Sequence, residues 1–184
     1  LDYWKHISAD FSGIALRRTL KTPVIARVNG LALGGGLEMV MGCDIVVAAD
    51  TARFALPEAK VGRVPLDGGM VMLQRLIPRN IAVGMMMTGR MVLAPEMARY
   101  GLLNAVVPMA DLDAEVDEWV ADILASAPLS VRAIKTLARE TSEMTVHDAF
   151  TRETPELIAA LNSEDANEGV TAFLEKRAPI WTGS

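Results

Sequence analysis

The order of apolar and polar positions divides the chain into two parts. In the N-terminal part strands and helices alternate, and the C-terminal part is dominated by helices. Short apolar runs, the first of them rich in β-branched residues, predict buried strands in the N-terminal part. These runs cover residues 23–28, 44–49, 53–55 and 103–107. A Leu- and Met-rich segment from Leu37 to Gly42 predicts a helix between the first two. This alternation favours an α/β fold.

Helices are predicted for much of the remaining chain. Residues 68–90 are typical of two helices that meet at Pro78, and residues 94–101 have proline near the start and glycine at the end, as short helices often do. Four further helices are expected after residue 108, starting near Asp111, Pro128, Thr145 and Ser163, the last of them reaching Lys176. The apolar spacing of residues 12–20 also fits a helix. Methionines between residues 70 and 87 could line an acyl pocket, although core packing is their more frequent role.

Three consecutive glycines, Gly34 to Gly36, follow the first predicted strand closely. Without Cβ atoms they allow a sharp turn and a close approach of backbone N–H groups to a ligand. Gly35 and Gly36 would lie at the start of the following helix, where N–H groups are unpaired and the helix dipole is positive. Such a place suits a developing oxyanion.

Two glutamates lie beside these turns. Glu38 is one turn into the helix, where the dipole favours a negative charge, so we expect its carboxylate to stay ionised even if partly buried. Glu58 directly follows Pro57, which fixes the backbone and presents Glu58 from a stiff corner. Taken singly, Glu38 is an ordinary helix-start residue and Glu58 a solvated turn charge. Their joint placement beside glycine turns instead favours an active site in which two carboxylates share acid and base work.

These motifs resemble those of the enoyl-CoA hydratase/isomerase (crotonase) superfamily. Residues 29–38 carry Asn-Gly-x-Ala-x-Gly-Gly-Gly-x-Glu, and residues 54–69 carry Phe-x-x-Pro-Glu-x-x-x-Gly-x-x-Pro-x-x-Gly-Gly. Residues 54–60 are most similar to the carnitinyl-CoA dehydratase (crotonobetainyl-CoA hydratase) branch. The likeness continues at residues 88–90, 101–107 and 163–177, and therefore covers nearly the whole chain.

The resemblance implies a fold and a reaction. The fold is a crotonase-like spiral of ββα repeats, with residues 1–108 as the C-terminal part of the spiral core that carries the active site and residues 109–184 as a helical trimerisation region. The implied enzyme is an acyl-CoA hydro-lyase of fatty acid metabolism, which adds water to a 2-enoyl-CoA, or removes it, through a thioester enolate held in an oxyanion hole. Gly35 would supply one oxyanion N–H, and Glu38 and Glu58 would be the catalytic acids and bases. Coenzyme A is part of the substrate, and no separate cofactor is expected.

Four further residues are candidates for substrate binding by this resemblance: Gly34, Leu66, Phe173 and Lys176. Hydratases of the family usually carry glycine at the position of Leu66, so a branched side chain would lie close to the reacting water, and Asp67 adds a charge. The acyl group is therefore left open. Phe173 and Lys176 contribute in relatives to the coenzyme A site, often that of a neighbouring subunit, but a solvated helix end explains them equally well.

Other functions remain possible at this point. A double-bond isomerase, or another reaction of crotonase type, is the nearest alternative, although two retained glutamates favour hydration. A crotonase-fold subunit without catalytic activity, acting as a scaffold or binding module, is the second. A dinucleotide-binding fold is excluded because the glycines lack the G-x-G-x-x-G spacing.

Composition narrows the class of protein. The 184 residues are 51% hydrophobic and 22% charged, as expected for one soluble globular domain, and the net charge of −5 argues against a general nucleic-acid surface. Cys43 is the only cysteine, so no internal disulfide can form and we expect it to be a core residue. No signal peptide or membrane-spanning apolar run is visible, which makes the cytoplasm the default location. Neither His6 nor His147 has a spacing that suggests a metal site or a Ser-His-Asp arrangement.

The resemblance also predicts partners. A homotrimer or hexamer is expected. In the family, an Ala-Gly-x-Asp-type segment that supplies the first oxyanion N–H, and the strands before it, precede the position of Leu1. We therefore expect these 184 residues to be an incomplete enzyme that needs a missing N-terminal segment of the same protein, present as a separate piece.

Overall fold

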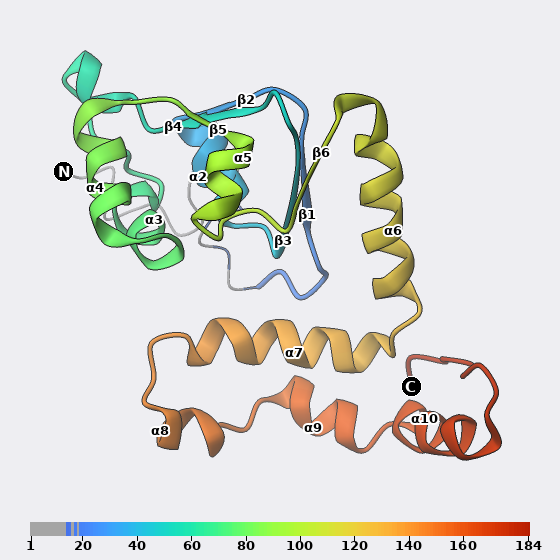
Figure 1. Cartoon of the computed structure of the whole chain (residues 1–184). Coiled ribbons are helices and arrows are strands. Elements are labelled where there is room, and N and C mark those ends of the chain that lie inside the picture. The colour runs from blue at the N-terminus through green and yellow to red at the C-terminus, as the bar shows by residue number, and fades with distance from the viewer. Residues whose placement is uncertain (1–13, 16, 18) are drawn as a thin grey trace. The chain divides into compact units, whose positions relative to one another are not determined.

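The computed structural model describes residues 14, 15, 17 and 19–184 (Figure 1). These residues belong to two compact units. The first unit runs from Val24 to Asp117 and includes the described residues up to Arg17. The second runs from Glu118 to Ser184 and includes residues 19–23. The boundary that the resemblance implies after residue 108, between the spiral core and a helical trimerisation region, stays a prediction.

Within its described residues, the first unit contains two three-stranded sheets. In one, β3 (Ile45–Ala49) lies between β1 (Ile25–Val28) and β6 (Ala105–Val107), and all three strands are parallel. In the other, β4 (Arg53–Ala55) pairs in parallel with β2 (Leu31–Leu33) and antiparallel with β5 (Val92–Leu93). The last residues of β3 are fully buried, which explains why this central strand is continuously apolar rather than alternating.

The strands β1, β3, β4 and β6 confirm the four expected ones, with ends that differ by no more than two residues. The sequence did not predict β2 and β5. β2 lies between Gly30 and Gly34, where glycines favour a turn, and β5 is only two residues long.

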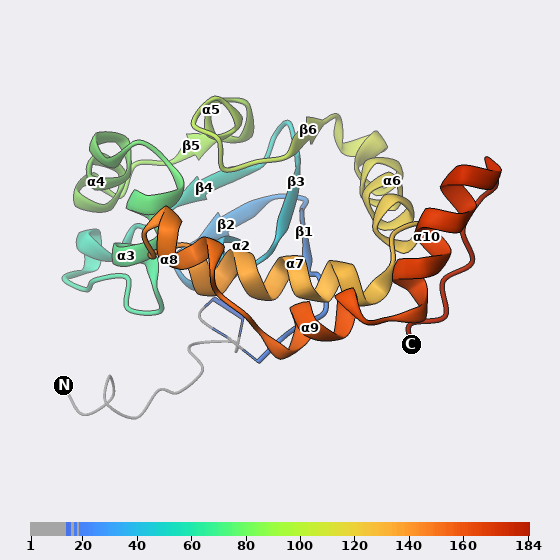
Figure 2. The ribbon, with the colours of Figure 1, turned by 90° about the horizontal axis from the view of Figure 1, so that it is seen from below.

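The helices of the first unit follow the expected order. The helix after the glycines is α2 (Gly35–Met41). The segment 68–90 forms α3 (Gly69–Leu76) and α4 (Arg79–Thr88), which lie side by side and are separated by Pro78 (Figures 1 and 2). The short helix with proline near its start is α5 (Ala94–Arg99). Two 3₁₀ turns, η2 (Glu58–Val61) and η3 (Met109–Asp111), complete the unit, and α6 (Leu112–Leu124) continues from it into the second.

The second unit is helical. It contains α7 (Pro128–Thr141), α8 (Val146–Phe150), α9 (Pro155–Leu161) and α10 (Glu164–Glu175), and α7 runs beside α9 (Figure 2). Two of the predicted helix starts are confirmed by side-chain caps. The hydroxyls of Thr145 and Ser163 accept hydrogen bonds from backbone N–H groups in the first turns of the helices that follow them. The sequence did not predict α9, which begins after Thr154 with the same kind of cap.

The prediction of a helix over residues 12–20 is wrong for those residues of the range that the structure describes. Ile14 and Ala15 form a turn, and residues 17, 19 and 20 are irregular. A Cβ placed on Gly42 would lie 2.4 Å from the Cα of Ala15, so this turn packs directly on the end of α2. The other residues of the range lie outside the described part of the chain. No helix among the described residues is long and apolar enough to cross a membrane.

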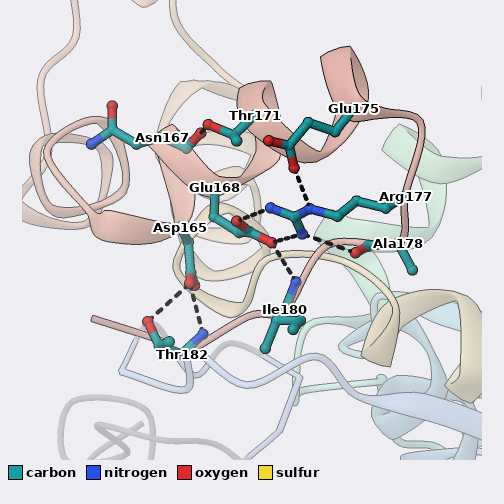
Figure 3. A network of polar contacts seen from close by, with 9 residues as sticks. All are labelled: Asp165, Asn167, Glu168, Thr171, Glu175, Arg177, Ala178, Ile180 and Thr182. Atoms are coloured by element: carbon teal, nitrogen blue, oxygen red, sulfur yellow. Dashed lines mark hydrogen bonds and ion pairs between the residues drawn. The ribbon is translucent and has the colours of Figure 1, made fainter.

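Carboxylates on α10 fasten the chain that follows it, an arrangement called here the C-terminal clasp (Figure 3). The carboxylate of Glu168 accepts hydrogen bonds from both terminal nitrogens of Arg177, at 2.6 and 2.8 Å, and from the N–H of Ile180 at 2.8 Å. Asp165 accepts the N–H of Thr182 at 2.7 Å. These bonds pin residues 177–182 to α10.

Candidate active site

The glycine turn places the start of α2. Gly34 has a φ of +56°, in the left-handed region that favours glycine, and its N–H donates to the carbonyl of Ala55 at the end of β4 at 2.9 Å. Gly35 and Gly36 are the first residues of α2, as expected, and their N–H groups belong to the first turn, which has no acceptors within the helix. The turn that the sequence predicted is therefore fixed between a strand end and a helix start.

Glu38 is buried under this turn. Its side chain is on α2, the residue is 3% exposed, and its Oε1 accepts the N–H of Gly69 at 2.8 Å. The pKa of Glu38 is raised above its usual value of 4.5, mainly by burial. The Gly69 hydrogen bond lowers this pKa, whereas the negative charges of Asp67 and Glu58 raise it further. Burial and these two like charges thus disfavour the ionised form of Glu38. That its carboxylate stays ionised although buried stays a prediction.

Glu58 is the first residue of η2 and follows Pro57, as the sequence predicted. Its Oε1 lies over Gly34, since a Cβ on Gly34 would be only 2.8 Å from that oxygen. Its Oε2 is buried and has no hydrogen-bond partner among the residues that the structure describes. A buried carboxylate oxygen without a partner is unfavourable, and such atoms are candidates for contact with a bound ligand or water.

The fold brings the two glutamates to one place. They are twenty residues apart in the sequence and come from α2 and η2. The charge of Glu58 contributes to the raised pKa of Glu38, and Glu58 also packs on the glycine that caps the helix of Glu38. The arrangement can hold a proton at one carboxyl group while the other accepts one.

Sequence reasoning missed the role of Gly69. Its N–H holds Glu38, and there is no room for a side chain at this position. A Cβ on Gly69 would be 2.7 Å from the Cβ of Pro65, 2.9 Å from Oε1 of Glu38 and 3.0 Å from Cδ1 of Leu56. The motif did contain a signal, since two glycines at the start of a helix indicate close backbone packing. It did not identify Glu38 as the partner of Gly69.

Leu66 lies in the turn that leads into α3, directly before Asp67, and it is half-buried. Its proximity to a reacting water stays a prediction. Among the methionines, Met85 is buried in α4 and Met87 on the same helix is 76% exposed, so they do not share one environment.

Phe173 and Lys176 belong to the second unit. Phe173 is 82% exposed near the end of α10, and Lys176 ends that helix with a φ of 55°. A role for these two residues in holding coenzyme A stays a prediction.

The remaining candidates for chemistry are unremarkable. Among the described residues, no group of three or more His, Cys, Asp or Glu side chains is arranged to hold a metal ion. His147 is exposed on α8, and His6 lies outside the described residues. Cys43 is half-buried rather than fully in the core, and its thiol donates to the carbonyl of Met39.

Comparisons with known proteins identify relatives of this chain. The family profile described as Enoyl-CoA hydratase/isomerase matches residues 3–184. Carnitinyl-CoA dehydratases from Shigella flexneri and from Escherichia coli K12 are each 44% identical to it over 177 residues. Each alignment covers 94% of this chain and 68% of the relative.

Solved structures agree with these relatives. An enoyl-CoA hydratase from Mycobacterium tuberculosis H37Rv superposes with a TM-score of 0.89 at 32% identity, over 97% of this chain and 70% of the other. An enoyl-CoA hydratase from Mycobacterium smegmatis gives 0.85 at 36% identity, over 92% and 66%. The chain thus spans about two thirds of the length of the proteins that it matches.

Proposed function

Because the chain belongs to the enoyl-CoA hydratase/isomerase family and has the crotonase fold, we propose that it adds water to a 2-enoyl-CoA thioester or catalyses the reverse dehydration. One observation carries the proposal. Oε2 of Glu58 is buried without a hydrogen-bond partner among the described residues, beside a buried Glu38 whose pKa is raised. A water molecule held between the two carboxyl groups would satisfy that oxygen and would also be the nucleophile that hydration needs.

In the proposed reaction the thioester oxygen accepts the N–H of Gly35 at the start of α2. Attack of water on the β-carbon then produces an enolate, whose negative charge this N–H stabilises. The two glutamates position the water, take one of its protons and return one proton to the α-carbon, so that the proton count balances. Loss of one donor of such an oxyanion hole typically costs about 3 kcal/mol of transition-state stabilisation.

A panel of enoyl-CoA thioesters tests this function. The panel includes crotonyl-CoA and crotonobetainyl-CoA, and the measurement is the loss of absorbance of the conjugated enoyl group. We expect turnover with at least one member, and we expect Gly35→Val to abolish it because a branched side chain beside this N–H would obstruct the thioester. Full activity of the Gly35→Val variant would reject the oxyanion assignment. A gain rather than a loss of absorbance with 3-enoyl-CoA substrates would identify the isomerase alternative.

We further propose that the protein acts as a homotrimer or hexamer. The helices of the second unit support this assembly, since they expose large apolar side chains that an interface could cover. Examples on α8, α9 and α10 are Val146, Phe150, Leu161, Val170, Phe173 and Leu174. Sedimentation velocity at micromolar concentration measures the assembly, and a strictly monomeric and active protein would contradict it.

A further segment of the same protein is also proposed to complete the site. Among the described residues, β1 and β2 each pair with one strand only, and an apolar groove of about 340 Å³ runs along both. Unpaired strand edges are commonly covered in native proteins. Co-expression with the preceding coding sequence tests the idea, with activity and recovery of soluble protein as the readouts.

A further inference from the structure

The turn that carries Glu58 contains an exposed stretch of chain between two buried residues. Leu56 before it is fully buried, Pro65 after it is buried, and every residue from 59 to 64 is exposed. The turn is closed by its own backbone, since the N–H of Arg63 donates to the carbonyl of Glu58 at 2.9 Å. This hydrogen bond fixes the shape of the turn but not its place in the unit.

A lysine side chain connects this turn to a neighbouring helix. Lys60 is in η2, and its side chain lies against Gly89, which directly follows α4 with a φ of +58°. A Cβ on Gly89 would be 2.9 Å from Cε, 3.0 Å from Cδ and 3.1 Å from Cγ of Lys60. Three successive methylene groups therefore occupy the place of the missing side chain. Since η2 and α4 pack side by side, the apolar stem of Lys60 is a contact between them.

Glu58 depends on this turn for its position. Its Oε2 has no hydrogen-bond partner among the described residues, and its Oε1 lies over Gly34, which has no side chain. The position of the carboxylate therefore follows that of the η2 backbone. Because a misplacement of about 1 Å can lower the rate of a catalysed reaction about a hundredfold, a contact that fixes η2 affects turnover.

We propose that Lys60 is a positioning residue for the proposed hydration, on which this inference rests. Its aliphatic stem, packed on Gly89, holds η2 and so keeps the carboxylate of Glu58 in place. Two other roles predict different results. An exposed lysine can be a solvated charge without effect on turnover, or its ammonium group can bind a phosphate of coenzyme A, which needs the charge and not the stem. Substitutions that separate stem from charge distinguish these roles.

The first test compares two variants of Lys60. Lys60→Ala removes both stem and charge, whereas Lys60→Met keeps an unbranched stem and removes the charge. With the member of the enoyl-CoA panel that the wild type hydrates fastest, kcat of Lys60→Ala should fall roughly tenfold to a hundredfold with little change in KM, and Lys60→Met should keep the wild-type kcat. Equal kcat in all three proteins, or equal changes of kcat or KM in the two variants, would overturn the inference.

Combination with Glu58→Gln separates positioning from a general loss of structure. If Lys60 acts through Glu58, Lys60→Ala should not lower the residual turnover of Glu58→Gln any further, because no carboxylate is left to position. A merely structural role would lower the turnover in both backgrounds. A fall as large as in the wild-type background would therefore overturn the inference.

Gly89→Ala tests the same contact from the other side, since the added Cβ would displace the stem of Lys60. Gly101→Ala is the matched control, because Gly101 follows α5 with a φ of +90° but a Cβ there meets no atom within 4 Å. Both substitutions place a side chain on a left-handed residue, so both carry backbone strain. Only Gly89→Ala should lower kcat, by less than Lys60→Ala does. Equal effects of the two glycine substitutions would contradict the inference.

Hydrogen exchange gives a readout that needs no turnover. The N–H of Arg63 is bonded to the carbonyl of Glu58, so its exchange rate reports how often the turn opens. Exchange should be severalfold faster in Lys60→Ala and unchanged in Lys60→Met. A wild type that hydrates no thioester of the panel would reject the proposed function, while this difference in exchange would still show that the stem of Lys60 holds the turn. Equal exchange in all three proteins would overturn the inference whatever their activity.

Discussion

Carboxylates have opposite environments in the two units of this chain. In the C-terminal clasp of the second unit, Glu168 is bonded to Arg177 and to a backbone N–H, and these bonds lower its pKa to about 2 (Figure 3). In the first unit, burial raises the pKa of Glu38, and Oε2 of Glu58 has no partner among the described residues. Side chains of the same type are thus paired in one place and only partly paired in the other.

The difference indicates what each cluster can do. A carboxylate whose oxygens are bonded to a guanidinium and backbone donors stays ionised near neutral pH, so it fastens chain segments but cannot exchange protons there. A buried carboxyl group with a raised pKa, next to an unpaired oxygen, can take part in proton transfer. Pairing, rather than residue type, separates a structural cluster from a candidate catalytic one.

The largest expected effect comes from the unpaired glutamate. Glu58→Gln keeps the size of the side chain but removes the proton acceptor, so the turnover number should fall by roughly a hundredfold to ten-thousandfold. The urea midpoint should change little, because Oε2 has no partner to lose among the described residues. Glu168→Gln is the same substitution in the clasp and should retain activity. Near-normal hydration by Glu58→Gln would reject the mechanism that uses two glutamates.

Gly69→Ala should damage the anchor of Glu38. The added Cβ would lie 2.7 Å from the Cβ of Pro65 and 2.9 Å from Oε1 of Glu38, so the turn or the carboxylate must move. We expect a loss of about 1–3 kcal/mol in the free energy of unfolding, as for other overpacked sites, and a clear fall in the turnover number.

The control for this substitution is Gly84→Ala in α4, where an added Cβ meets no atom within 4 Å. That variant should be more stable by about 0.5–1 kcal/mol, because alanine is the better helix residue. Urea denaturation and steady-state kinetics on both variants make the comparison. A Gly69→Ala variant with the stability and turnover number of the wild type would show that the turn can move to accept the added Cβ.

These contacts mark the limit of what the sequence predicts. Runs of β-branched residues were sufficient for β1 and β3, and the motifs were sufficient to select Glu38 and Glu58 as a pair. The bond from Gly69 to Glu38 joins residues 31 apart, and no local pattern encodes it. The rise of the Glu38 pKa could not be predicted for the same reason, since burial by distant segments is its main cause.

The clasp was not predicted either. Asp165 and Glu168 are, by sequence, ordinary acidic residues in the first two turns of a helix, and only the return of residues 177–182 gives them partners. The cap of α10 by Ser163 was predictable because it is local, with the acceptor and donor three residues apart. Local signals thus determine where the helix begins, whereas tertiary contacts determine which partners its carboxylates bind.

A smaller effect, on stability, is expected for Glu38. In the folded state the pKa of Glu38 lies above its unfolded value, which is near 4.5. Ionisation of Glu38 therefore lowers the free energy of unfolding. This loss of stability is absent below the unfolded pKa and grows as pH rises through the folded pKa. Glu38→Gln removes this loss and can still accept the N–H of Gly69. The variant should therefore be inactive yet more stable than the wild type at pH 7, with equal stability near pH 4. A variant that is less stable at pH 7 would show that the hydrogen bonds to the carboxylate outweigh its burial.

The smallest effect is expected for the clasp, because its ion pair is partly exposed and surface pairs contribute little. The folded pKa of Glu168, about 2, lies below the usual value of 4.5. Its contribution to stability is therefore fully present above about pH 4.5 and is lost as pH falls toward 2. Glu168→Gln should slightly lower the urea midpoint at pH 7, and this difference should shrink as pH falls toward 2, where the wild-type carboxyl group becomes protonated. Urea titrations of both proteins across this pH range measure the difference, and a gap that widens on acidification would contradict the pairing with Arg177.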